Sequence, residues 1–324
     1  MSSEPVFLVG CIRSGTTILH TTLTAGCPSA IDLDDEDFEG RTFWQARGYR
    51  IGSPRTGTRC DAADGLDLTD ERRGEIVEWC ARRTTGGRHI VNKNPHLSNK
   101  IGLIHRLFPR ARIVHVVREV PAVVASTKRR FEASGNGHTY WRAPFVYYWP
   151  GGVDLPCWWV IPAEGTGPMV CRESSGRRVM NLVRGSPSIP AGHEAPEAFR
   201  RRFPDGTRYF PGEGFRRLPE SWLSLNANVI RQVESLAITH LYLPVNYASL
   251  VERTKETIRR IAEFSEIERV DLSAVPDALD TTRRHQWRHT LRREERDAID
   301  QVVEVHHADA QLIRDRLPGP LFVA

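Results

Sequence analysis

The 324-residue sequence has no apolar run approaching the roughly 18 residues that a membrane span needs. Its N-terminus also lacks the charged, apolar and small-residue order of a signal peptide. Six cysteines are scattered without a C-x-x-C pair, which argues against a zinc site and against a dense disulfide framework. Hydrophobic residues make up 40% of the chain, enough for a substantial core. We therefore expect a globular cytoplasmic protein with reduced thiols.

Lysine is scarce as well, because only four lysines stand among the 45 basic residues. The formal net charge is +5, but acidic residues are spread through the same segments as the arginines. A nucleic-acid-binding protein would more typically gather its basic residues in a stripe with interleaved aromatics. The composition therefore disfavours nucleic acid as a partner and favours a small anionic ligand held by a few placed arginines.

Strand and helix patterns alternate through the first 131 residues. The strand-like stretches are VFLVG, RHIVNKNP and ARIVHVV, and the helical ones are TTILHTTLTAG, LSNKIGLIHRLF and PAVVASTKRRF. Alternation at this spacing predicts an α/β fold with a central parallel sheet, flanked by helices, that binds ligands at the carboxyl ends of its strands. Beyond residue 220, SWLSLNANVIRQVESL predicts a helix, HLYLPVNY a strand, and KETIRRIAEFSEI and RREERDAIDQVVEVHHADAQLIRDRL two further helices.

The stretch 132–220 interrupts this pattern. Eleven of the 21 prolines and four of the eight tryptophans lie in it. So many prolines prevent long regular elements, whereas the aromatics are too numerous for a disordered linker. We expect an ordered, loop-rich insertion within a single domain spanning 1–324. Its aromatic residues suit an acceptor-binding wall, or they form the core of the insertion itself.

The segment GCIRSGTT, Gly10 to Thr17, has the outline of a phosphate-binding loop between a strand and a helix. Position 16 carries threonine where such loops in nucleotide triphosphatases carry lysine, and the positive charge stands at Arg13 instead. Backbone amides and the hydroxyls of Thr16 and Thr17 would still hold an anion. A terminal group with less charge than a γ-phosphate, such as a sulfuryl group, has less need of the lysine and of Mg²⁺. An ordinary strand-turn-helix with a glycine cap is the alternative.

A second motif, VVREVPAVVAS, places Arg118 at the end of a strand and Ser126 eight residues later on a helix. With RSGTT before it, this pair resembles the sulfotransferases that depend on 3′-phosphoadenosine 5′-phosphosulfate (PAPS). The segment NKNPHLSNKIGLIHRLFPRARIVHVVR is similar to the tyrosylprotein sulfotransferases and their bacterial relatives. The resemblance covers residues 5–131 and, more weakly, 222–264. It implies the P-loop-like sulfotransferase fold, PAPS as co-substrate and no metal.

The resemblance also implies roles for individual residues. Arg13 and Lys93 would stabilise charge on the sulfuryl oxygens and on the leaving phosphate, although Lys93 could instead pair with a surface carboxylate. The cofactor-binding set that it implies consists of Arg13, Ser14, Gly15, Thr16, Thr17, Arg118, Ser126, Arg130 and Tyr247. Near the C-terminus, Arg283 and Arg284 either close over the nucleotide or form a surface patch.

The acceptor hydroxyl must lose a proton, so a general base should lie within hydrogen-bond reach of it. One candidate is the acidic run IDLDDEDFEG, which supplies Asp34, Asp35 and Glu36. The other is His96, because small-molecule sulfotransferases carry a histidine just after an equivalent lysine. Acidic runs are also common as solvated loops, and a lone histidine is often structural. The carboxylates are favoured, and the individual base stays open.

These motifs predict a sulfotransferase that moves a sulfuryl group from PAPS to a hydroxyl of a small-molecule acceptor, such as a sugar, a lipid or a natural product. One alternative is a P-loop kinase or nucleoside-phosphate enzyme, which the missing lysine disfavours. A non-catalytic nucleotide-binding module is the other. Such a module would not need a buried-strand lysine, an acidic cluster and an aromatic insertion together.

Overall fold

The computed structural model describes residues 4–35, 39–47, 68–132, 213–282 and 285–322. Within this part, five strands form one sheet in the order β2-β3-β1-β4-β5, and every neighbouring pair is parallel. The strands are β1 (Val6–Val9), β2 (Ala30–Asp32), β3 (His89–Lys93), β4 (Arg112–Val117) and β5 (Tyr242–Asn246). The predicted α/β fold with a central parallel sheet flanked by helices is confirmed.

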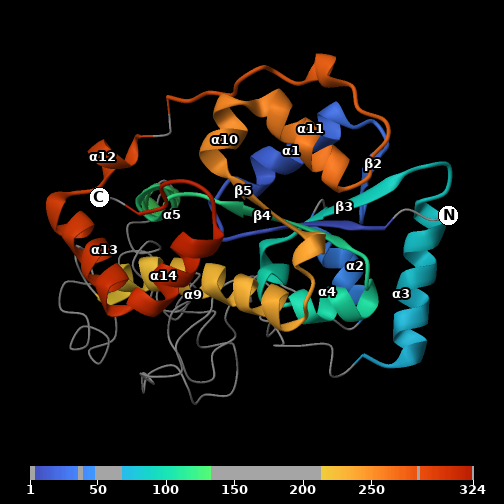
Figure 1. Cartoon of the computed structure of the whole chain (residues 1–324), viewed down its shortest axis with the longest axis horizontal. Helices are drawn as coiled ribbons and strands as arrows, with labels where there is room; N and C mark the ends of the chain where they lie inside the picture. Colours follow the sequence, from blue (N-terminus) through green and yellow to red (C-terminus); the bar gives the residue numbers. More distant parts are fainter. Residues whose placement is uncertain (1–3, 36–38, 48–67, 133–212, 283–284, 323–324) are drawn as a thin grey trace, which may run out of the picture.

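Helices cover both faces of the sheet (Figure 1). They are α1 (Thr16–Gly26), α2 (Arg41–Ala46), α3 (Asp70–Arg83), α4 (Ile101–Leu107), α5 (Val120–Glu132), α9 (Glu213–Ser235), α10 (Tyr247–Glu252), α11 (Thr254–Phe264), α12 (Trp287–Thr290), α13 (Arg293–Val305) and α14 (His307–Arg316). Short 3₁₀ turns are η2 (Pro95–Asn99), η3 (Thr239–Leu241) and η4 (Leu272–Ala274). In Figure 1, α1, α10 and α11 lie above the sheet, and α4, α9 and α14 lie below it.

The central strand β1 shows why the sheet is buried on both faces. Val6 and Leu8 pack in the cluster that holds the apolar residues of α1 and α11. Phe7 and Val9 point the other way, into the cluster with α4. All four side chains are fully buried, as expected for a parallel strand that reads as a continuous apolar run.

The strand order creates a topological switch point at the carboxyl edge, between β1 and β4, and we refer to this place as the crevice. The chain leaves β1 toward the β3 side and leaves β4 toward the β5 side, although β1 and β4 are neighbours. Their outgoing connections therefore diverge, and ligands of open parallel sheets bind at such a switch point. The loop after β1 and the segment after β4 flank this crevice, so the sheet topology alone brings the two predicted phosphate-binding motifs together.

Several elements differ from the sequence-based expectation. The acidic run begins inside a short edge strand, β2, and the helix expected from residue 221 already begins at Glu213. The C-terminal tail forms two helices instead of one, because His306 has a non-helical ψ of 37° between α13 and α14. Most of the predicted insertion, residues 133–212, lies outside the described residues.

Candidate functional site

The loop Gly10–Thr17 joins β1 to α1, and two of its glycines are required by geometry. Gly10 has a φ of 147° and Gly15 a φ of 102°, a region that favours glycine. A Cβ atom at Gly10 would lie 2.5 Å from the carbonyl oxygen of Val116. One at Gly15 would lie 2.4 Å from the ring of Tyr247. The loop therefore passes close to β4 and close to the residue that follows β5.

Internal hydrogen bonds hold this loop in shape. The backbone amide and the hydroxyl of Ser14 both donate to the carbonyl oxygen of Cys11, at 3.1 and 2.5 Å. The amide of Gly10 donates to Oγ of Ser98, at 2.9 Å. At the start of α1, Thr16 is buried and Thr17 is exposed. The first amides of α1 receive no side-chain cap from Gly15, so the helix start can donate to an anion.

Four predicted residues from separate parts of the chain meet beside the loop, and we name them the arginine cluster: Arg13, Arg118, Ser126 and Tyr247. Nε of Arg13 donates to Oγ of Ser126 at 3.1 Å. Nη1 of Arg118 donates to the carbonyl oxygen of Arg13 at 3.4 Å. The guanidinium of Arg118 lies over the ring of Tyr247, with its central carbon 4.3 Å from the ring centre. Arg118 and Ser126, which are eight residues apart in the sequence, thus lie with the other two residues of the cluster in one compact basic site.

Electrostatics in the arginine cluster favour an anionic ligand. Arg118 is only 9% exposed, and this burial lowers the pKa of its guanidinium, against the opposing influence of Tyr247 and Glu119. Arg13 adds a second positive charge at the same place and lowers the pKa of Arg118 further. Two guanidinium groups held close together with a hydroxyl are the donors that a phosphate group accepts best.

Lys93 ends β3, next to β1, and its side chain is almost fully buried. Nζ of Lys93 pairs with Oε1 of Glu39. The amide of the Asn94 side chain donates to the backbone carbonyl of Glu39 at 2.7 Å, which fixes the residue in place. Glu39 belongs to the acidic run but was not among the predicted bases. The adjacent Gly40 was the available signal, since its φ of 66° permits the turn that brings Glu39 back to the sheet.

The predicted carboxylates Asp34 and Asp35 have other partners. Oδ2 of Asp34 accepts the backbone amide of Phe43 at 2.8 Å, in the first turn of α2. Asp35 is exposed and pairs with Arg83 at 2.5 Å. The hydrogen bond from Arg83 is the main reason that the pKa of Asp35 is lowered. These contacts describe a helix cap and a surface ion pair.

The structure does not describe the side chains of the remaining predicted site residues. Glu36, Arg283 and Arg284 are among the residues that the structure leaves out, and nothing is described for the side chains of His96 and Arg130. Over the described ranges, no three His, Cys, Asp or Glu side chains gather to hold a metal ion. No helix among the described residues is long and apolar enough to cross a membrane.

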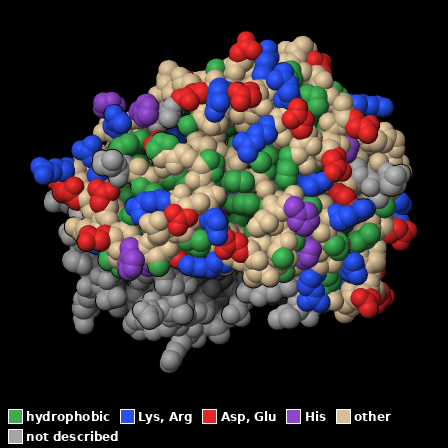
Figure 2. Space-filling model, in the orientation of Figure 1, with side chains coloured by type: hydrophobic (Ala, Val, Ile, Leu, Met, Phe, Trp, Pro, Cys, Tyr) green, Lys and Arg blue, Asp and Glu red, His purple; other side chains and the backbone are tan. Residues whose placement is uncertain are grey.

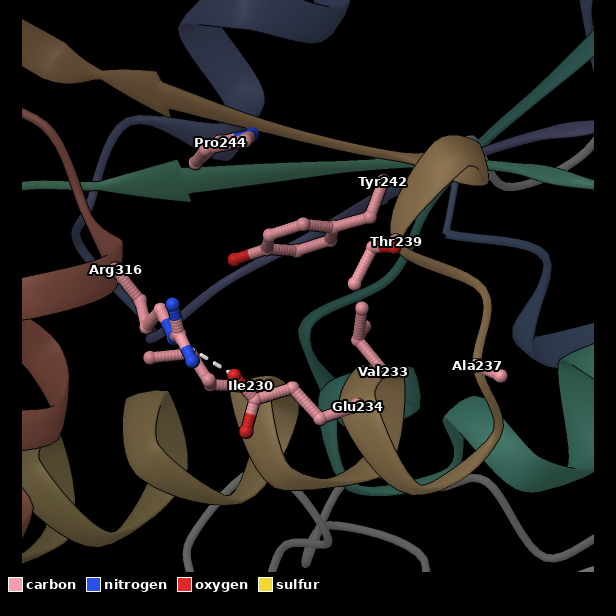
Figure 3. Close-up of a pocket in the computed structure, with 8 residues that line it drawn as sticks. All are labelled: Ile230, Val233, Glu234, Ala237, Thr239, Tyr242, Pro244 and Arg316. Atoms are coloured by element: carbon pink, nitrogen blue, oxygen red, sulfur yellow. Dashed lines mark ion pairs between the residues drawn. The ribbon is translucent and has the colours of Figure 1, made fainter.

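A separate cavity of about 610 Å³ lies between α9, β5 and α14 (Figure 3). Tyr242 and Pro244 form one wall, and Ile230 and Val233 are among the residues opposite. An ion pair between Arg316 and Glu234, at 2.7 Å, spans the cavity. None of the predicted site residues lines this cavity, so it is distinct from the arginine cluster.

Comparison with known proteins supports the class that the sequence motifs resemble, the sulfotransferases. Residues 5–150 match the model of the family described as the Sulfotransferase family. This segment contains the loop, Lys93, Arg118 and Ser126. The match to this segment confirms the resemblance to the sulfotransferases found in the sequence and supports a transferase. No curated protein matches the chain.

Several solved structures are similar to the chain at low identity. The sulfotransferase domain from the curacin biosynthetic pathway is 12% identical, with 94% of this chain and 98% of that chain covered and a TM-score of 0.47. A sulfotransferase from Alicyclobacillus acidocaldarius is 13% identical, with 97% and 96% covered and a TM-score of 0.46. The sulfotransferase domain of the Synechococcus PCC 7002 olefin synthase is 15% identical, with 94% and 95% covered and a TM-score of 0.45. The fold assignment rests on the sheet order and not on these scores.

Proposed function

We propose that this chain transfers a sulfuryl group from PAPS to a hydroxyl of a small-molecule acceptor. The observation that carries the proposal is the arginine cluster. It joins the phosphate-type loop after β1 to Ser126 through the 3.1 Å hydrogen bond from Arg13. A donor nucleotide with phosphate groups at both ends of its ribose needs two such anion sites close together, and PAPS has this shape.

The nucleotide would lie across the crevice between β1 and β4. The amides at the start of α1, with Thr16 and Thr17, would hold the 5′-phosphosulfate. Arg118 and Ser126 would hold the 3′-phosphate, as the family resemblance implies. Arg13 contacts Ser126 and lies in the loop, so its charge would serve both ends of the nucleotide. Tyr247 supports Arg118 by stacking its ring against the face of the guanidinium.

The transfer step would use Lys93 and Glu39. The acceptor oxygen forms a bond to sulfur while the bond from sulfur to the 5′-phosphate oxygen breaks, giving a sulfate ester and adenosine 3′,5′-bisphosphate. Lys93 would stabilise the charge that grows on the leaving phosphate oxygen. We assign the proton of the acceptor hydroxyl to the carboxylate of Glu39. When the ammonium of Lys93 turns to the sulfuryl group, the carboxylate of Glu39 accepts that proton.

The choice of a small acceptor rests on chemistry at the edge of the crevice. The Lys93–Glu39 pair is nearly buried, with side-chain exposures of 3% and 18%. A single hydroxyl on a slender molecule reaches such a pair more readily than a side chain of a folded protein does. The predicted acceptor-binding residues of the stretch 132–220 lie almost entirely outside the described part.

Transfer from labelled PAPS to a panel of hydroxylated sugars, lipids and phenols tests this function. We expect label in at least one acceptor without added Mg²⁺, and none with an Arg13→Ala variant. Label transfer from γ-labelled ATP with none from PAPS would instead identify a kinase and overturn the proposal. The exposed Arg253, which pairs with Glu256 on the surface of α11, provides a matched control as Arg253→Ala.

A further inference from the structure

A buried ion pair joins the helix α5 to the C-terminal part of the molecule. Nζ of Lys128 lies 2.7 Å from Oε1 and 2.9 Å from Oε2 of Glu295. The same ammonium donates to the carbonyl oxygen of Thr290 at 3.3 Å. The Glu295 side chain is fully buried, and that of Lys128 is 8% exposed. The ammonium of Lys128 therefore has at least three acceptor atoms within hydrogen-bond distance, two of them on Glu295.

Further hydrogen bonds hold Glu295 in place and connect the two segments on either side of the ion pair. Oε2 of Glu295 also accepts the backbone amide of Arg292 at 2.8 Å, which closes the first turn of α13. On α5, the neighbouring Arg129 donates to the side chain of Gln286. Before α5, Glu119 accepts from the indole of Trp287 at 3.0 Å. The segment 286–295 is thus attached to α5 along its length.

Along the chain, the residues that would hold the nucleotide alternate with the residues that attach α5 to the segment 286–295. Arg118 precedes Glu119 directly, and Ser126 precedes Lys128 by two positions. Helical residues two positions apart point in different directions, so Ser126 faces the loop while Lys128 faces α13. A rotation of α5 would move the Ser126 hydroxyl relative to Arg13. The ion pair between Lys128 and Glu295 limits this rotation.

Stability alone does not account for such a pair. A buried ion pair commonly contributes no more to stability than apolar side chains of the same volume, because both charges must leave water. The pair does fix the relative orientation of α5 and α13, because its hydrogen bonds require one placement of the two helices. We propose that the Lys128–Glu295 pair is a positioning device for the 3′-phosphate subsite: it holds Ser126 at the place where that phosphate binds. This inference rests on the proposed function.

The test compares two nucleotides that differ only in the 3′-phosphate. Adenosine 3′,5′-bisphosphate and adenosine 5′-monophosphate are titrated calorimetrically into the wild type and into Lys128→Met/Glu295→Gln. The double variant removes both charges, so neither is left buried alone. We expect the wild type to prefer the bisphosphate, and the double variant to lose at least about fivefold of that preference while its affinity for the monophosphate stays within about twofold.

The variant Lys255→Met and the wild type itself are the two controls. They distinguish failure of the positioning role from failure of the proposed function. Lys255→Met removes a lysine that pairs with Asp277 on the surface, and it should leave the preference unchanged. A double variant that keeps the full preference, or that loses affinity for both nucleotides equally, overturns the positioning role. A wild type without any preference for the bisphosphate refutes the proposed function itself, and the positioning role with it. The single variant Lys128→Met, if it folds, should lose the preference as well.

Discussion

At the residue scale, the arginine cluster places positive charge beside a phosphate-type loop that has no lysine. Arg13 supplies the charge from inside the loop, and its left-handed φ of 64° points the side chain toward Ser126 instead of along α1. Arg118 supplies a second charge from the neighbouring strand. These residues were predicted because the motifs that contain them resemble those of the PAPS-dependent sulfotransferases. Glu39 was not predicted, because contact with Lys93 depends on how the chain turns after β2.

Replacing Arg118 by alanine should weaken nucleotide binding. The variant loses a charge-assisted contact to phosphate, which costs about 1.5–3 kcal/mol, or roughly 10- to 150-fold in affinity. Calorimetry with adenosine 3′,5′-bisphosphate measures the change, and Arg253→Ala is the matched control. Wild-type affinity in a folded Arg118→Ala variant would remove this residue from the phosphate site.

Replacing Lys93 by methionine should lower turnover far more than nucleotide affinity. An ammonium that acts mainly on the charge of the transition state is worth about 10²–10³-fold in rate. Turnover with PAPS is compared with the dissociation constant of adenosine 3′,5′-bisphosphate in the same variant. A loss confined to affinity would make Lys93 a binding residue only.

Replacing Glu39 by glutamine should cut turnover by roughly 10²–10⁴-fold, because the amide cannot accept the acceptor proton. Glutamine keeps the length of the side chain and can still accept a hydrogen bond from Lys93. The matched acid-to-amide substitution Asp35→Asn, at a residue that pairs with Arg83 at the surface, should leave turnover within about twofold. An inactive Asp35→Asn variant beside an active Glu39→Gln variant would identify Asp35, and not Glu39, as the base.

At the scale of elements, the strongly patterned segments could be predicted, whereas a short strand and a break within a helical pattern could not. The strand β4 follows from the β-branched run RIVHVV, and α11 follows from its apolar positions at helical spacing. The break between α13 and α14 was missed, because nothing in EVHHADA marks the non-helical His306. The strand β2 was missed too, since three residues beside an acidic run carry no periodic signal.

The strand β4 also carries a buried polar residue, His115. Its Nε2–H donates to Oδ1 of Asn226 at 2.9 Å, and its Nδ1 accepts from the hydroxyl of Tyr242 at 2.8 Å, an arrangement that requires the neutral ring. Burial is the main reason that the pKa of His115 falls to about 4 from its usual 6.5. The folded state therefore binds this proton less readily than the unfolded chain does.

Stability should consequently fall on acidification between about pH 6.5 and pH 4, where the unfolded chain is protonated and the folded one is not. The contribution of His115 between pH 7 and pH 5 is about 2 kcal/mol by this linkage. Urea unfolding at the two pH values measures it, with His115→Gln as the comparison. An equal loss of stability in the wild type and in His115→Gln would show that other groups are responsible.

At the scale of the whole molecule, the sheet order decides where the site forms. Because β1 and β4 are neighbours whose connections diverge, motifs more than a hundred residues apart in the sequence meet at one crevice. Among the described residues, positive and negative side chains are interspersed over the face seen in Figure 2, so that face is not dominated by one sign of charge. The α/β class followed from alternation, whereas the Lys128–Glu295 pair, 167 residues apart, left no trace in the sequence.

The central claim is that the crevice binds a nucleotide with a 3′-phosphate and needs no metal to do so. Calorimetric titration of the wild type with adenosine 3′,5′-bisphosphate in the presence of a chelator tests it most directly, with ATP titrated in parallel. We predict tight binding of the bisphosphate, unchanged when Mg²⁺ is restored, and no binding of ATP without Mg²⁺. Binding of ATP that depends on Mg²⁺, with none of the bisphosphate, would contradict the account.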